Sequence, residues 1–236
     1  MHAIRFSGVR KLFANSAALD DVHLDIVPGE FFGLVGVNGA GKTTLIKCLL
    51  DFCFLDAGTI EIFGVSHRES RSREPLAFLP ERFAPPHFLK GKDFLDLMGR
   101  LYRSQFAEAD IEAMLNALDL SRAALDKPVR QLSKGMTQKL GLAGCLLAKR
   151  RLYVLDEPMS GLDPKARALL MATLREMRQA GTTIFFTSHA LVDVDELADR
   201  MAILHDGRLR FCGTPTELRE RFAAAKLEDA FLLAIA

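Results

Sequence analysis

Residues 36–43 read Gly-Val-Asn-Gly-Ala-Gly-Lys-Thr and match the pattern GxxxxGK[ST] at every fixed position. The run FFGLVG (31–36) favours a β-strand, and the stretch KTTLIKCLLDF (42–52) that follows favours a helix. In a strand–loop–helix unit of this kind the glycines let the backbone approach a ligand closely, so that successive N–H groups can surround phosphate oxygens. The stretch therefore predicts a nucleotide phosphate-binding loop, which kinases, GTPases and transport ATPases share.

The residues of this loop have predicted contacts with the nucleotide. Lys42 can reach the β- and γ-phosphate oxygens, Thr43 can ligate Mg²⁺ through its hydroxyl, and Thr44 can donate to the α-phosphate. A helix that begins near Gly41 adds the positive partial charge of its N-terminus. The other predicted nucleotide-binding positions are Gly36, Val37, Asn38, Gly39 and Ala40.

A second apolar run, RLYVLDEP (151–158), ends in two carboxylates. Ligands bind at the carboxyl ends of the strands in open α/β sheets, so Asp156 is placed to hold Mg²⁺ directly or through water. Glu157 is placed to polarise the water that attacks the γ-phosphate. An adjacent Asp-Glu pair can also be a solvated strand end, but the apolar run before it and the phosphate loop favour a functional interpretation.

Two other polar positions have weaker signals. His189 ends the apolar run TTIFFTSH (182–189), where it can hydrogen-bond the γ-phosphate and orient Glu157 or the water. Taken alone, it fits an ordinary polar residue at a strand-to-helix corner better. Ser133 and the Gly135 backbone open a helical run and can form either an anion site or a simple helix cap. Local physical chemistry leaves both possibilities open.

Strand and helix patterns alternate along the chain, which predicts an α/β fold with a largely parallel sheet. Apolar residues at helical spacing predict a small helical subdomain, inserted at roughly Phe88 to Pro128. We expect a hairpin that turns at Asp206-Gly207, a helix capped by Asp163, and a closing helix after Thr214. The tail after Phe222 predicts no particular structure.

The composition is that of a soluble globular chain. Of 236 residues, 49% are hydrophobic, and 31 Lys and Arg against 30 Asp and Glu leave a net charge of +1. This balance indicates no strong electrostatic footprint for nucleic acid, so no such partner is expected. The cysteines have neither a disulfide framework nor zinc spacing, and the apolar runs are shorter than the ~18 residues of a membrane span. We expect a cytoplasmic chain that relies on another subunit for any membrane process.

In their order along the chain, these motifs resemble those of the nucleotide-binding subunit of ATP-binding cassette (ABC) transporters. GVNGAGKTT resembles the Walker A motif, LYVLDEP resembles Walker B, and LSKGM (132–136) resembles the family signature, commonly LSGGQ. SGLD (160–163) resembles the D-loop and His189 the switch histidine. A signature shortly before Walker B, after a helical insertion, separates this family from other P-loop proteins. The resemblance extends from Ile4 to about Phe222.

The fold implied by the resemblance is one P-loop NTPase cassette over 1–236. It has a mainly parallel core sheet, an antiparallel β subdomain and a helical subdomain inserted at about 88–145. The family also implies a sandwich of two cassettes, each a copy of this chain or a homologue, around ATP and Mg²⁺. Glu157 and His189 would be catalytic. The signature residues would meet the partner's nucleotide and Asp163 would link the two sites; these signature residues are Ser133, Lys134, Gly135 and Met136.

Three departures from the family pattern affect the predicted site. Glu81, in FLPE (78–81), stands where the family usually has Gln; its carboxylate can still meet Mg²⁺ together with Thr43 and Asp156, but it adds negative charge. Lys134 and Met136 replace the usual Gly and Gln of the signature. Phe13 stands where the family places an aromatic ring under adenine, and a role in the core is the alternative for it.

The Glu81 stretch and the signature are similar to those of cassettes paired with ABC-2-type export permeases. The implied function is ATP hydrolysis that powers export through a separate integral membrane permease, with this chain on the cytoplasmic face. Permease helices would enter a groove beside Glu81 and residues 88–128. One alternative is a soluble ABC ATPase of DNA repair or translation, although the chain has one cassette and no long coiled-coil insertion. The other is a small-molecule kinase, against which LSKGM followed by SGLDP argues.

Overall fold

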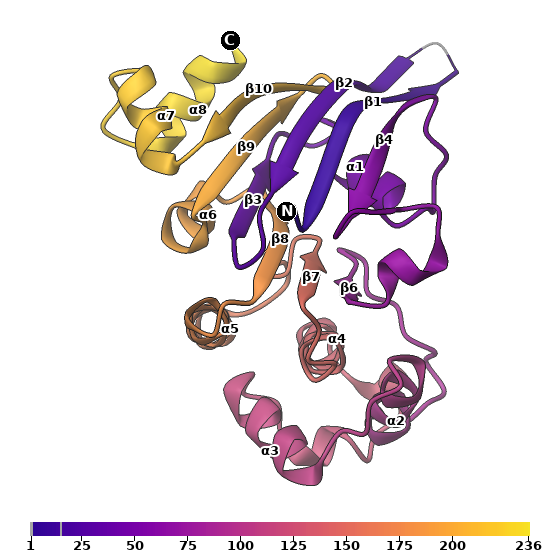
Figure 1. Ribbon diagram of the computed structural model, residues 1–236. Helices are drawn as coiled ribbons and strands as arrows, with labels where there is room; N and C mark the ends of the chain where they lie inside the picture. Colours follow the sequence, from indigo (N-terminus) through magenta and orange to yellow (C-terminus); the bar gives the residue numbers. More distant parts are fainter. Residues whose placement is uncertain (1, 15) are drawn as a thin grey trace.

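The computed structural model describes residues 2–14 and 16–236. Its centre is a six-stranded sheet with the strand order β10-β9-β3-β8-β7-β6 (Figure 1). The pairs β3–β8, β3–β9, β7–β8 and β6–β7 are parallel and only β10 runs antiparallel to its neighbour β9. These strands are β3 (Phe31–Val35), β6 (Leu76–Leu79), β7 (Leu152–Leu155), β8 (Thr183–Ser188), β9 (Arg200–His205) and β10 (Arg208–Gly213). The predicted mainly parallel core sheet and the hairpin turn at Asp206-Gly207 are confirmed.

A second, antiparallel sheet lies beside the first, with the order β2-β1-β4-β5 (Figure 1). It corresponds to the predicted antiparallel β subdomain. Its two longest strands, β1 and β2, are 10 and 11 residues long and pair with several shifts in register. The strands are β1 (Ile4–Phe13), β2 (Ser16–Ile26), β4 (Ala57–Ile62) and β5 (Val65–Ser66).

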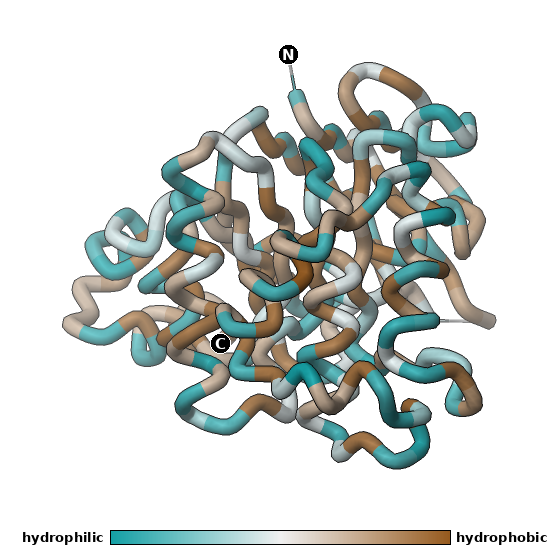
Figure 2. The backbone as a smooth tube through the Cα atoms, turned by 90° about the horizontal axis from the view of Figure 1, so that it is seen from below, coloured by the Kyte–Doolittle hydropathy of each residue, from teal (hydrophilic) through white to brown (hydrophobic). Residues whose placement is uncertain are grey.

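The central strands are apolar throughout because their two faces serve two different cores. In β3, Phe31 and Val35 belong to one hydrophobic cluster, and Phe32 and Leu34 belong to the other. Successive side chains of a strand point to opposite faces, so a strand that is buried on both sides shows no polar alternation. The first cluster lies under most of the helices, and the second lies between the two sheets and α1. Figure 2 shows hydrophobic segments in the middle of the molecule and many hydrophilic outer turns.

Three α-helices follow β6 and precede β7, at the end of the molecule opposite the antiparallel sheet (Figure 1). They are α2 (Gly91–Leu101), α3 (Glu108–Ala117) and α4 (Lys134–Leu146). The other α-helices are α1 (Lys42–Leu49), α5 (Pro164–Gln179), α6 (Leu191–Leu197), α7 (Pro215–Arg221) and α8 (Leu227–Ile235). Within residues 2–14 and 16–236, every helix is too short or too polar to cross a bilayer.

The predicted helix caps are confirmed, whereas the tail after Phe222 forms a helix that the sequence analysis did not predict. Asp163 caps α5 by accepting a hydrogen bond from Ala166 N at 2.9 Å, and Thr214 caps α7 by accepting from Glu217 N at 3.1 Å. Beyond Phe222, α8 packs its buried Leu227 and Ala230 against the main hydrophobic cluster. The apolar residues 230–235 therefore belong to a docked helix, which the sequence analysis did not predict.

Candidate active site

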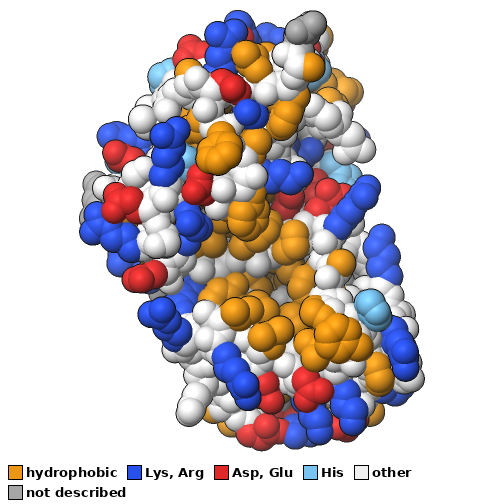
Figure 3. Space-filling model, turned by 90° about the vertical axis from the view of Figure 1, so that its right-hand side faces the viewer, with side chains coloured by type: hydrophobic (Ala, Val, Ile, Leu, Met, Phe, Trp, Pro, Cys, Tyr) orange, Lys and Arg blue, Asp and Glu red, His pale blue; other side chains and the backbone are white. Residues whose placement is uncertain are grey.

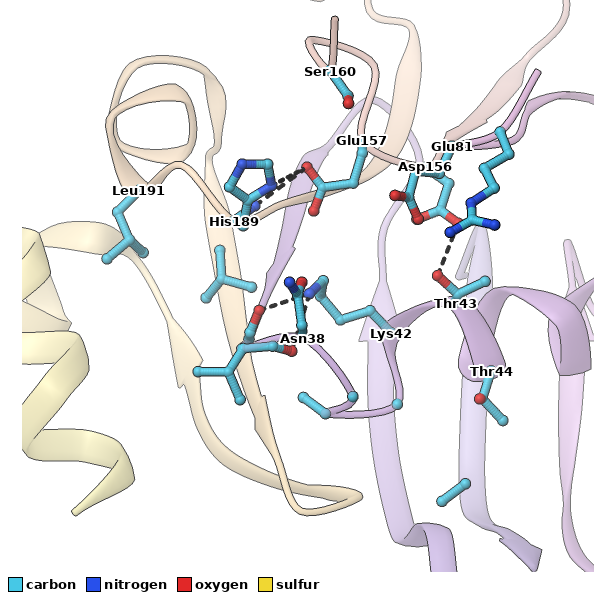
Figure 4. A pocket seen from close by; sticks show the side chains of 18 of the residues that line it. Asn38, Lys42, Thr43, Thr44, Glu81, Asp156, Glu157, Ser160, His189 and Leu191 are labelled. Carbon is cyan, nitrogen blue, oxygen red and sulfur yellow. Dashed lines mark hydrogen bonds and ion pairs between the residues drawn. The ribbon is translucent and has the colours of Figure 1, made fainter. Parts of the chain in front are cut away.

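The parallel strands bring four loops to one edge of the sheet. Strand β3 leads into the phosphate loop, β6 into the loop with Glu81, β7 into Asp156 and Glu157, and β8 into His189. They surround a cavity of about 700 Å³ (Figure 4). The residues that line it are Ala18, Val35, Gly36, Val37, Asn38, Gly39, Ala40, Gly41, Lys42, Thr43, Thr44, Glu81, Arg82, Asp156, Glu157, Ser160, His189, Leu191 and Phe231.

The loop of residues 36–43, hereafter the P-loop, requires glycine at two positions for steric reasons. A Cβ on Gly36 would lie 2.3 Å from the Leu204 carbonyl oxygen. Gly41 has φ +110°, and a Cβ there would lie 2.5 Å from the Ala18 carbonyl oxygen. The loop is thus pressed against its neighbours on one side and turns its backbone toward the cavity on the other. This cradle fits the phosphates of a nucleotide, which backbone N–H groups and the start of α1 can bind.

Lys42 is buried at the bottom of the cavity. Its Nζ donates to the Gly36 carbonyl oxygen at 2.6 Å. Burial lowers the pKa of the Lys42 ammonium, while the nearby carboxylates of Glu157, Asp156 and Glu81 act in the opposite direction. The ammonium is therefore held within the P-loop and faces three acidic groups, and it has the charge to bind phosphate oxygens.

The Thr43 hydroxyl and the Asp156 carboxylate are hydrogen-bonded to each other next to the P-loop (Figure 4). The Thr43 hydroxyl donates to Asp156 Oδ2 at 3.1 Å, and Asp156 Oδ1 accepts from the buried Thr187 hydroxyl at 2.6 Å. The hydroxyl–carboxylate pair fits the preference of Mg²⁺ for oxygen ligands, with phosphate oxygens completing its shell. Thr187 orients the carboxylate and was not singled out by the sequence analysis.

Glu157 and His189, which both line the cavity, contact each other directly (Figure 4). His189 Nδ1 lies 2.8 Å from Glu157 Oε2, and the His189 backbone N–H donates to the same oxygen at 3.4 Å. Because a carboxylate only accepts, the hydrogen bond places the proton on Nδ1 of His189. Glu157 also has φ +51°, and its backbone N–H donates to the Thr187 hydroxyl at 2.9 Å. The predicted base and the predicted switch histidine are thus brought together.

Glu81 lines the same cavity but on the side of β6, and its charge acts on Lys42. The neighbouring Arg82 also lines the cavity, so a cation accompanies the carboxylate that replaces the usual glutamine. The proposed metal-binding role of Glu81 remains a prediction. The sequence signal for Arg82 was its position beside Glu81, which the sequence analysis did not use.

Most signature and D-loop residues lie away from the cavity. Ser133 caps α4 by accepting a hydrogen bond from Met136 N at 3.2 Å, as the helix-cap alternative requires. The Lys134 side chain and the Gly135 backbone both approach Gly161 of the D-loop, with Lys134 Cε 3.4 Å from the position of an added Cβ there. Among the described residues that line the cavity, Ser160 is the one D-loop member. A role of Ser133, Lys134, Gly135, Met136 and Asp163 toward a second cassette stays a prediction.

Phe13 lies at the end of β1 with 51% of its surface exposed, and Lys11 Nζ lies 5.3 Å from its ring centroid. It is not among the described residues that line the cavity, but its exposure argues against a role in the core. Stacking under adenine stays a prediction. Leu191 and Phe231 add two apolar side chains to the lining of the cavity, and Phe231 comes from α8, which the sequence analysis did not predict.

Comparisons with known proteins address the family directly. The family model described as "ABC transporter" matches residues 19–160, which is more than half of the chain. The chain belongs to the ABC transporter family. A solved "ATP binding subunit of ABC transporter" superimposes with a TM-score of 0.89 at 28% identity, covering 98% of this chain and 99% of that one. The predicted cassette fold is therefore confirmed.

Curated relatives of this ABC protein include ATP-binding proteins of transport systems. The daunorubicin resistance ATP-binding protein DrrA3 of Streptomyces coeruleorubidus is 35% identical over 96% of this chain, and the Nod factor export ATP-binding protein I of Mesorhizobium japonicum is 34% identical over 97%. An uncharacterized ABC transporter ATP-binding protein of Synechocystis is 38% identical over 85% of the chain. The chain spans 72%, 68% and 58% of the lengths of these three relatives, respectively.

Proposed function

We propose that the chain binds and hydrolyses ATP with Mg²⁺ and that hydrolysis powers export through a separate membrane permease. The contact of Glu157 with His189, beside the Thr43–Asp156 pair, is the observation that carries the proposal. A carboxylate that accepts from a histidine can take a proton from a water that attacks the γ-phosphate, while the histidine orients the carboxylate. When bound, Mg²⁺ supplies positive charge to the phosphate oxygens.

The relatives named above support a transport role over the alternative of a soluble ABC ATPase in DNA repair or translation, because their names refer to transport and resistance. By the same resemblance, the working form is a pair of cassettes. The signature helix α4 begins directly after its cap Ser133, and the N–H groups of its first turn and the Ser133 hydroxyl can bind an anion. Among the described residues that line the chain's own cavity there is no signature residue, which supports a role toward the nucleotide of a second cassette.

An exposed apolar surface supports the proposal of a membrane partner. Phe52 and Phe54 follow α1, Phe88 precedes α2, and Leu101 ends α2; all four side chains are exposed. Figure 3 shows hydrophobic side chains gathered in a hollow across one face of the molecule. Exposed apolar side chains gathered on one face are a common feature of protein interfaces. We propose that these residues contact the permease, which would hold the chain on the cytoplasmic face of the membrane.

The test is affinity purification of the intact chain from detergent-solubilised membranes of its own cells, followed by mass spectrometry. Recovery of a multi-span membrane protein is expected, and the double variant Phe54→Ser/Leu101→Ser should lose it while keeping ATPase activity. The matched control is Leu232→Ser, which changes an exposed leucine on α8. Recovery of repair or ribosomal partners only, with no membrane protein, would contradict the transport proposal.

Glu81 offers a second, narrower test. If its carboxylate senses the metal and transmits closure to the permease, Glu81→Ala should reduce both Mg-ATP hydrolysis and its stimulation by the permease. Glu81→Gln, which restores the usual residue of the family, should retain the stimulation. Unchanged hydrolysis and stimulation in Glu81→Ala would remove Glu81 from the site.

A further inference from the structure

Helix α5 carries three arginines that pair with carboxylates on or directly after α6. The pairs are Arg167–Asp193, Arg175–Glu196 and Arg178–Asp199. They join the same part of the fold and are alike in chemistry, but they differ in burial. The Asp193 side chain is 3% exposed, against 44% for Glu196 and 33% for Asp199. The burial of Asp193 in the first pair therefore needs a physical reason, whereas a solvated surface ion pair needs none.

A buried carboxylate needs both a counter-charge and hydrogen bonds to stay ionised. Arg167 supplies the counter-charge through its guanidinium, which contacts Asp193 Oδ1. The other oxygen, Oδ2, lies 3.4 Å from the Ser188 hydroxyl, which can donate to it or to the Ala190 carbonyl oxygen at 3.2 Å. Asp193 thus connects an arginine on α5 with the last residue of β8.

Ser188 directly precedes the catalytic candidate His189. Its hydroxyl also accepts a hydrogen bond from Ala190 N at 3.0 Å. The residues immediately before and after His189 are therefore hydrogen-bonded to each other. His189 in turn contacts Glu157 through its ring and its backbone N–H. Side-chain contacts therefore lead from Arg167 to Asp193 and from Asp193 to Ser188. Ser188 is covalently joined to His189, which contacts Glu157.

The other end of this series of contacts lies at the D-loop. Asp163 caps α5, and its carbonyl oxygen accepts from Arg167 N at 2.9 Å. Arg167 is thus one helical turn from the D-loop, whose Gly161 contacts the signature residues Lys134 and Gly135. We infer that Arg167 and Asp193 are positioning residues that hold His189 against Glu157 and link the D-loop to this contact. The inference rests on the proposed ATPase function, in which His189 and Glu157 act together.

The decisive variant is Asp193→Asn, which keeps the shape of the side chain and removes its charge. We expect kcat for ATP to fall by ~10-fold to ~100-fold, because a small misplacement of a catalytic group has effects of this order. The KM for ATP should stay within about twofold, since the P-loop and Lys42 are untouched. Arg167→Lys keeps the positive charge and should lose less kcat than Arg167→Ala.

The matched control is Glu196→Gln, which removes the exposed ion pair between the same two helices. It should leave kcat unchanged. A readout that a merely structural role would not move is the NMR signal of the His189 ring in the protein without nucleotide. It should shift in Asp193→Asn and in Ser188→Ala but not in Glu196→Gln, with the buried His67 as an internal reference.

Each outcome is decisive for the inference. Equal kcat losses in Asp193→Asn and Glu196→Gln, or an unmoved His189 signal in the folded Asp193→Asn and Ser188→Ala variants, would overturn it. If Asp193→Asn does not fold, Ser188→Ala and Arg167→Lys provide the same comparison. A wild-type chain that hydrolyses no ATP would contradict the proposed function, whereas the His189 signal still tests the positioning, because that measurement needs no nucleotide.

Discussion

The two sides of the cavity are built in different ways. The P-loop side, residues 36–44, is one contiguous segment that acts mainly through backbone groups and Lys42. The switch side is assembled from Asp156 and Glu157 after β7 and from Thr187 and His189 at the end of β8. The first side depends on local conformation and the second on the register of two neighbouring strands. Changes on the P-loop side should therefore affect nucleotide binding, and changes on the switch side should affect turnover.

The largest effect is expected on the switch side. Glu157→Gln should lower kcat by ~10²-fold to ~10⁴-fold, the range associated with loss of a general base, while ATP binding persists. ATP-bound dimers should then accumulate, which light scattering after size-exclusion chromatography can detect. Glu30→Gln, at a buried glutamate outside the cavity, is the control and should hydrolyse ATP normally. Near-normal turnover of Glu157→Gln would remove Glu157 as the base.

On the P-loop side, Lys42→Ala should weaken ATP binding. Loss of a buried, hydrogen-bonded charge partner costs about 2–5 kcal/mol, which corresponds to at least a ~30-fold higher Kd. Equilibrium binding of a fluorescent ATP analogue measures the change. Lys139→Ala removes another buried lysine, which pairs with Asp119 and Asp163 outside the cavity, and should leave the Kd unchanged. Equal Kd values for Lys42→Ala and the wild type would contradict the phosphate role of Lys42.

The two buried threonines at the opposite ends of β8, Thr187 and Thr183, test whether the switch side depends on Thr187 in particular. The buried Thr187 hydroxyl serves Asp156 Oδ1 and the Glu157 N–H, so its loss in Thr187→Val leaves both without that partner. We expect the free energy of unfolding to fall by about 1–3 kcal/mol and kcat to fall with it. Urea denaturation and ATPase assays check the two effects. Thr183→Val, at the opposite end of β8, removes the partner of Gly29 N and should reduce stability without reducing kcat.

The smallest effect is expected at Phe13, beyond the P-loop. If its ring stacks on adenine, Phe13→Ala should raise the Kd for ATP by an amount that corresponds to about 1–3 kcal/mol. Phe13→Tyr should retain the affinity, and Phe54→Ala on another exposed surface is the control. An unchanged Kd for ATP in Phe13→Ala would argue that Phe13 does not contact the base.

The sequence predicted the P-loop side and most of the switch side because the residues involved lie in short segments at strand ends. Once β3, β7 and β8 are parallel, their carboxyl ends must meet at one edge of the sheet, and His189 gains the contact with Glu157 that its local pattern did not indicate. The α8 helix could not be predicted in the same way. Its apolar residues are too few to show a clear period, and they become buried only because α6, β9 and β10 lie beneath them.

By itself, the sequence determined the phosphate loop, the carboxylate strand end and the family, because each depends on residues that are adjacent in the chain. Only the tertiary structure decided which of the three arginine–carboxylate pairs is buried, since Asp193, Glu196 and Asp199 look alike in the sequence. It also decided that Phe231 lines the cavity. A side chain is buried by neighbours that are often far away in the sequence, so a local pattern of residues does not show which side chains are buried.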